Sequence, residues 1–141
     1  MASEAGRGRR PAILLTLGLE GPDPEEAELQ GPELAHHVVD LLVDRQASDV
    51  VMLDLTSLST FTDYFVIATA GNERQLSALI ETLDADANAA KRPLRQEGSP
   101  DGGWVLVDLG GVVVHLFSLE KRAYYDLEGL WKRAQEVVRV Q

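Results

Sequence analysis

The chain has 141 residues, no cysteine and a formal net charge of −10, with 13 basic residues against 23 acidic ones. The lack of cysteine excludes disulfides, thiolate metal ligands and a cysteine nucleophile. Ten carboxylates and one cation, Arg45, lie between Glu20 and Asp54. Because proteins that bind nucleic acids depend on cations to neutralise phosphates, this charge argues against direct, sequence-specific nucleic-acid binding. It favours a basic protein partner, although the acidity could also serve only to keep the protein soluble.

The first 30 residues are rich in Gly, Pro and Glu, and we predict that residues 1–30 form a flexible N-terminal extension. The apolar run at 12–19 is too short to span a membrane, and no small-residue cleavage site of a secretory signal follows it. We therefore expect a cytoplasmic protein that does not insert into membranes, with a single domain over residues 31–139.

The domain is predicted to begin with an amphipathic helix over 32–46. Pro32 suits the start of a helix, and Leu34 and Val38 open an apolar stripe at helical spacing. Two strands are predicted over 49–55 and 62–70, where β-branched and aromatic residues are frequent.

The second half of the domain is predicted to begin with another helix. Asn72 and Gln75 have the spacing of a capping box, and Pro93 would stop the helix that follows. A short edge strand over 94–96, a hairpin over 104–117 and a final helix reaching Val138 are then expected. This order predicts an α/β fold: a compact single domain with a mixed sheet of about five strands flanked by helices.

The hairpin is the most informative segment, because Gly110 and Gly111 join its two strands. Both glycines are expected to have positive φ in a two-residue turn, and the turn fixes the register of the strands. One face is then uniformly aliphatic and belongs in a core. The other face mixes aromatic, acidic and imidazole side chains: Trp104, Leu106, Asp108, Val113, His115 and Phe117. This second face is either a binding surface or another core side in which His115 and Asp108 form a hydrogen-bonded pair.

Motifs for catalysis and metal binding are sparse. The sequence contains no glycine-rich phosphate loop of the standard kinds and no nucleophile elbow. Asp84 and Asp86 are two residues apart on a predicted helix and do not face each other, and a metal site at His36 and His37 would need ligands from other helices. We therefore predict no enzyme activity, no metal and no cofactor. Arg74, in the first turn of the second helix, is either a binding contact or an exposed, energetically neutral residue.

Seven short segments, taken in order, resemble the ribosomal silencing factor (RsfS/Iojap) family. Each segment is weak alone, but their order and spacing are specific, and the resemblance as a whole runs from about Leu34 to Trp131. The segments are DVVMLDL at 49–55, TDYFVI at 62–67, RQ at 74–75, EG at 97–98, GWVLVDLG at 103–110, VVVHLF at 112–117 and YYDLEGLW at 124–131. Two details depart from the family pattern: Gly111 stands where the family commonly has Asp, and the connection at 71–75 is one residue shorter and lacks a serine.

The resemblance implies a fold related to nucleotidyltransferases but without their catalytic residues. It also implies that the protein binds the large ribosomal subunit through ribosomal protein L-fourteen. The resemblance places this contact at the face of the large subunit that meets the small subunit. Occupying that face would block association of the two subunits, so the protein would repress translation and oppose the assembly of mature ribosomes. The interface carried over by resemblance comprises Trp104, Leu106, Asp108, His115, Phe117, Asp63, Tyr64 and Arg74.

Two alternatives remain beside this hypothesis. A nucleotidyltransferase-like enzyme would need a pair of metal-binding carboxylates next to a Gly-Ser loop; Gly98 and Ser99 supply the loop, but Asp101 and Asp108 are not spaced as such a pair. The other alternative is a dimeric adaptor for ribosome assembly, because the sequence does not exclude a homodimer.

Overall fold

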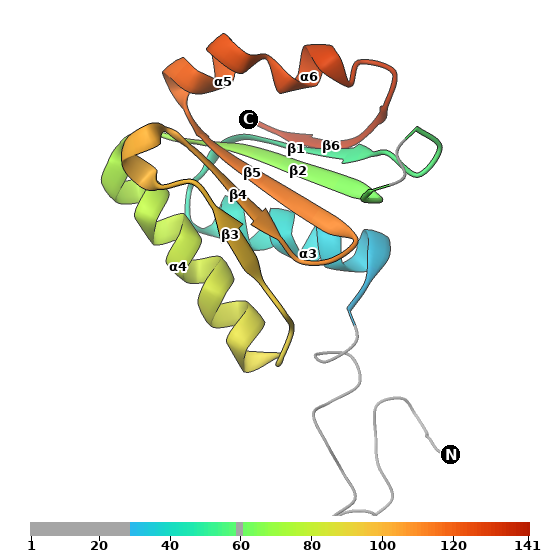
Figure 1. Ribbon diagram of the computed structural model, residues 1–141, viewed down its shortest axis with the longest axis horizontal. Helices are drawn as coiled ribbons and strands as arrows, with labels where there is room; N and C mark the ends of the chain where they lie inside the picture. The colour runs from blue at the N-terminus through green and yellow to red at the C-terminus, as the bar shows by residue number, and fades with distance from the viewer. Residues whose placement is uncertain (1–28, 59–60) are drawn as a thin grey trace, which may run out of the picture.

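A computed structural model describes residues 29–58 and 61–141 (Figure 1). The predicted N-terminal extension therefore lies almost entirely outside the described residues. In chain order the elements are α3 (Gly31–Asp44), β1 (Ser48–Asp54), β2 (Tyr64–Ala70), α4 (Glu73–Ala89), β3 (Arg95–Glu97), the 3-10 turn η1 (Pro100–Gly102), β4 (Trp104–Asp108), β5 (Val112–Ser118), α5 (Leu119–Tyr125), α6 (Leu127–Leu130) and β6 (Gln135–Val140). No helix in the described part of the chain is long and apolar enough to cross a membrane.

The six strands form one mixed sheet in the order β3-β4-β5-β2-β1-β6. β2 and β5 are parallel, and every other neighbouring pair is antiparallel. All seven residues of β2, which lies inside the sheet, are buried. Its nearly continuous apolar sequence follows from this position, because a strand covered on both faces has no solvated side.

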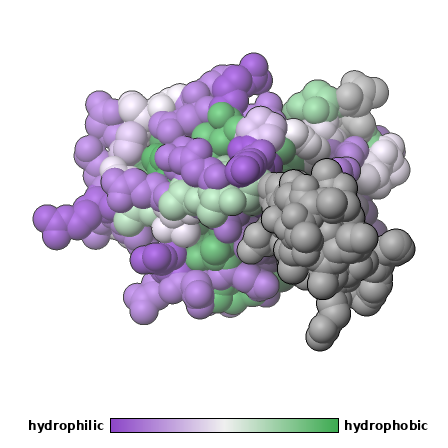
Figure 2. All heavy atoms as spheres, turned by 90° about the horizontal axis from the view of Figure 1, so that it is seen from below, coloured by the Kyte–Doolittle hydropathy of each residue, from purple (hydrophilic) through white to green (hydrophobic). Residues whose placement is uncertain are grey.

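Helices α3 and α4 cover one face of the sheet (Figure 1). The aliphatic face of the hairpin packs into this core, as predicted, through Val105, Val107, Leu109, Val112, Val114 and Leu116. The first half of the predicted capping box is present at the start of α4, where Asn72 Oδ1 accepts a hydrogen bond from the Gln75 N–H (2.7 Å). The second half is shifted by one residue, because Gln75 Oε1 accepts from the Gly71 N–H (2.6 Å), which precedes the cap. Figure 2 views the molecule from the side of α3 and α4, and most of the described residues that are visible there are hydrophilic.

The hairpin register is confirmed. Trp104 pairs with Phe117, and Leu106 pairs with His115. The turn differs in one detail, because only Gly110 of the two central glycines has a positive φ, of 93°. A positive φ at the first central position alone is typical of a type II′ turn, which also matches the twist of the strands.

The predicted final helix is wrong. The segment forms two short helices, α5 and α6, and then β6, which pairs with β1 as the sixth strand. Asp126 has a left-handed φ of 47°, which ends α5, and its side chain accepts a hydrogen bond from the Gly129 N–H to start α6. Beyond Trp131, the run Val137-Val138-Arg139-Val140 favours a strand, because β-branched residues pack well on a pleated surface.

Candidate protein-interaction surface

Strand β4 presents an aromatic and acidic surface that its covering helices leave partly open. Trp104, Leu106 and Asp108, here called the β4 surface, alternate with buried residues and are each half-buried. They lie on the same side of the sheet as α5 and α6, where Trp104 and Leu106 border the second hydrophobic cluster. That cluster is centred on β1, β2 and β5, so β4 lies at its edge.

Trp104 is held in one orientation by its neighbours. Its indole ring stacks on the buried Phe117, with ring centroids 5.1 Å apart, and contacts Tyr125 of α5 at 4.5 Å. Its Nε1–H donates a hydrogen bond to Nδ1 of His115 (3.2 Å). A large, partly exposed ring that is already held in place is the type of residue that carries much of the binding energy in protein interfaces. It has little conformational freedom left to lose when a partner binds.

His115 is a buried supporting residue, with 3% of its surface exposed. The predicted His115–Asp108 hydrogen bond is wrong, because Asp108 instead accepts from the Gly110 N–H (2.9 Å) and from Arg95 (3.3 Å). Since Nδ1 of His115 accepts from Trp104, the ring is neutral and carries its hydrogen on Nε2. Burial lowers the pKa of His115 from 6.5 to about 4.

Acidification is therefore expected to destabilise the fold through His115. The unfolded chain, with its histidine pKa near 6.5, binds more protons between pH 6.5 and 4 than the folded chain does, so stability falls as pH is lowered. Between pH 7 and pH 5 this group should remove about 2 kcal/mol from the unfolding free energy. Urea denaturation at both pH values measures the loss.

The variant His115→Asn keeps a hydrogen-bond acceptor but does not titrate, so its unfolding free energy should no longer fall between pH 7 and pH 5 through this group. The control His36→Asn replaces an exposed histidine and should retain the loss of stability. An equal loss in both variants would refute this assignment.

The other predicted contact residues are dispersed. Phe117 is fully buried beneath Trp104. Tyr64 is buried in the core on the α3 and α4 side, because its position in β2 directs it to the opposite face. His115, Phe117 and Tyr64 are thus buried rather than exposed, so in the predicted interface they would hold the exposed residues in place instead of touching a partner themselves.

Asp63 and Arg74 are both exposed, but they lie at opposite ends of the sheet. Asp63 lies beside the hairpin turn, where its N–H donates to the Gly111 carbonyl (3.1 Å), and Arg74 follows β2 in the first turn of α4. The six residue steps of β5 between the two ends correspond to about 20 Å. A partner that contacts the β4 surface and either residue must therefore cover one end of the sheet.

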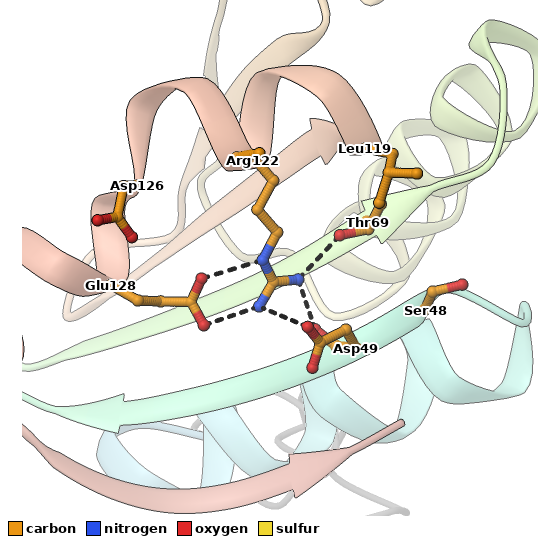
Figure 3. A pocket seen from close by; sticks show the side chains of 8 residues that line it. Ser48, Asp49, Thr69, Leu119, Arg122, Asp126 and Glu128 are labelled. Atoms are coloured by element: carbon orange, nitrogen blue, oxygen red, sulfur yellow. Dashed lines mark hydrogen bonds and ion pairs between the residues drawn. The ribbon is translucent and has the colours of Figure 1, made fainter.

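A second polar site was missed by the sequence interpretation. Arg122 of α5 is 8% exposed and points into a pocket between α5, α6 and the ends of β1 and β2 (Figure 3). Its guanidinium group forms a bidentate pair with Glu128 (3.1 and 3.0 Å) and donates to the Thr69 hydroxyl (2.9 Å) and to the Asp49 carbonyl (2.5 Å). These hydrogen bonds from Arg122 lower the pKa of Glu128. Because Arg122 of α5 bonds to Glu128 of α6, to Thr69 of β2 and to Asp49 of β1, the arrangement ties α5 and α6 to the sheet.

The histidine and aspartate candidates for a metal site form a different contact. His37 Nε2 of α3 lies 2.9 Å from Asp86 of α4, and Asp86 also pairs with Arg92 at 3.1 Å. Asp84 is exposed on another side of α4. This cluster joins the two helices, and within residues 29–58 and 61–141 no group of three or more His, Asp or Glu side chains could hold a metal ion.

Comparisons with known proteins agree with this fold. The family model described as ribosomal silencing factor during starvation (RsfS) matches residues 28–141. A protein named ribosomal silencing factor RsfS from Halalkalibacterium halodurans is 36% identical over 110 residues, which cover 77% of this chain and 94% of that protein. A mouse protein named mitochondrial assembly of ribosomal large subunit protein 1 is 34% identical over 145 residues, which cover 86% of this chain and 63% of that protein.

A crystal structure of a protein from Chromobacterium violaceum superposes with a TM-score of 0.68 at 31% sequence identity, covering 77% of this chain and 92% of that chain. The family match includes every helix and strand described above, from α3 to β6. The resemblance inferred from the ordered motifs is confirmed, and the chain belongs to the ribosomal silencing factor family.

Proposed function

We propose that this protein binds the large ribosomal subunit through ribosomal protein L-fourteen, blocks association with the small subunit and so represses translation. The observation that carries the proposal is the β4 surface, where Trp104 is half-exposed and held by Phe117 and His115. Family membership supports a ribosomal target, and the name of the mouse relative supports the large subunit in particular.

The charge of the chain is consistent with such a partner. A protein with a net charge of −10 is attracted to basic surfaces and repelled by free nucleic acid. Recognition of a basic protein surface rather than of RNA fits this acidity. We expect the protein to act in the cytoplasm, where it would meet ribosomal subunits.

The proposed mechanism is steric and non-catalytic. Blocking a subunit interface requires a rigid body that binds beside or on that interface, and it requires no chemical step. The six-stranded sheet supplies the rigid body, and the contacts of Trp104 with Phe117 and Tyr125 hold the anchor before binding. Such pre-organisation lowers the entropy cost of association.

Co-sedimentation of the full chain with separately purified large and small subunits tests the choice of target. The proposal predicts that the protein sediments with large subunits only, and that purified L-fourteen competes for it. Equal sedimentation with both subunits, or binding to large subunits that added L-fourteen does not reduce, would contradict the proposal.

Binding to large subunits is also expected to weaken as salt is raised, because the attraction between an acidic protein and a basic surface is screened over a Debye length of about 8 Å at physiological ionic strength. Association rates measured from 50 mM to 500 mM KCl should fall by about tenfold or more, whereas dissociation rates change less. An association rate that is constant across this range would exclude electrostatic steering by the acidic surface.

A further inference from the structure

Beside Trp104 lies a small depression of about 200 Å³ lined by Glu97, Gly98, Trp104 and Leu106. It is formed by Glu97 at the end of β3, by Gly98 directly after that strand, and by β4. Glu97 is paired directly with Leu106 in the antiparallel ladder, so both side chains project from the same face of the sheet. The depression therefore opens on the β4 surface, with one acidic wall and two apolar ones.

The backbone at Gly98 brings the wall of the depression close to β4. Gly98 has a positive φ of 88°, and a Cβ atom at this position would lie 2.5 Å from the backbone carbonyl oxygen of Trp104. Only glycine allows this approach without displacing backbone. The shape of the depression is thus fixed by main chain on one side and by the held ring of Trp104 on the other.

Glu97 is exposed and takes part in none of the ion pairs of the described residues. Arg95, the other charged residue of β3, is already paired with Asp108 at 3.3 Å. A carboxylate without a neutralising cation thus stands beside the ring of Trp104 and the aliphatic side chain of Leu106. A partner that covered it with apolar groups would leave an uncompensated charge in the interface, which is costly.

We propose that this depression receives one arginine side chain of the partner protein. The inference rests on the proposed docking of the β4 surface on the large subunit, and it names the chemistry that this surface recognises. The guanidinium group would pair with Glu97 and stack on the face of Trp104, while its aliphatic stem would lie on Leu106. Arginine fits better than lysine, because its planar group can bind a carboxylate in bidentate fashion and stack on an aromatic ring simultaneously.

The first test compares two variants that remove the same charge. Glu97→Gln keeps the size of the side chain in the depression, and Glu81→Gln removes an exposed carboxylate from α4 as the matched control. In titrations of the full chain with large subunits, Glu97→Gln should weaken binding by about tenfold or more and Glu81→Gln by much less. Equal effects of the two variants would overturn the inference, because they would reflect net charge alone.

The second test identifies the partner side chain by exchanging charges. Glu97→Arg should abolish binding to L-fourteen, and one Arg→Glu variant of that protein should restore it. If no Arg→Glu variant restores binding while Trp104→Ala still prevents it, the arginine assignment fails and the proposed function stands. If Trp104→Ala has no effect either, the proposed function itself fails, so the two failures are distinguishable.

Discussion

Replacement of Trp104 with alanine is expected to abolish binding to the large ribosomal subunit. Truncation of an interface anchor costs at least about 2 kcal/mol, or roughly 30-fold in affinity. Here the loss should be larger, because Trp104 also forms a wall of the depression beside Glu97. The dissociation constant for purified large subunits, measured by titration of a labelled full-length chain, gives the effect directly.

Stability must be measured in parallel, because Trp104 contributes to the fold as well. The alanine variant loses the stacking on Phe117 and leaves Nδ1 of the buried His115 without its donor, which should lower the unfolding free energy by about 2 kcal/mol. Trp131→Ala is the matched control. Trp131 is also half-buried and packs against Phe65 at 5.5 Å, but it lies at the end of α6. The control should lose stability and keep affinity; a folded Trp104→Ala protein with unchanged affinity would refute the role of the β4 surface.

Replacement of Arg122 with methionine is expected to destabilise the fold more than any substitution of an exposed charge. The variant removes the bidentate partner of Glu128 and the hydrogen bonds to Thr69 and Asp49. Removing one partner of a buried ion pair costs about 3–5 kcal/mol, because the remaining charge is left uncompensated. Arg139, which lies 3.4 Å from Glu128, offsets part of this loss, so we expect about 3 kcal/mol.

Urea denaturation followed by circular dichroism measures this loss, and Arg95→Met is the matched control. Arg95 pairs with Asp108, but 74% of its side chain is exposed. Exposed pairs contribute only about 0–1 kcal/mol, so the control should remain near wild type. A loss below 1 kcal/mol in Arg122→Met would mean that the network in Figure 3 does not hold α5 and α6 on the sheet.

The hairpin was predictable because residues close together in the sequence determine its turn and its strand register. The turn residues Gly110 and Gly111 fix the register, and the register then assigns every side chain of β4 and β5 to one face or the other. The sequence does not say which parts of a face are covered by helices, however. Alternation therefore placed His115 on the same face as Trp104 but did not reveal that it is buried beneath that ring.

The end of the chain was not predictable in the same way. Its apolar residues also fit a helical repeat, and the alternative depends on a pairing between β6 and β1, which are more than 80 positions apart. The Arg122 cluster is likewise assembled from distant positions, since Asp49, Thr69 and Glu128 come from three different elements. No short motif carries such a site, because the fold alone brings its members together.

Sedimentation of small and large subunits through a sucrose gradient, under conditions in which they join, tests the central claim most directly. Saturating wild-type protein should reduce the fraction of joined ribosomes and should migrate with the free large subunits. The Trp104→Ala variant should leave joining intact. Complete joining in the presence of saturating wild-type protein would contradict the proposed mechanism, even if the protein were bound to the large subunit.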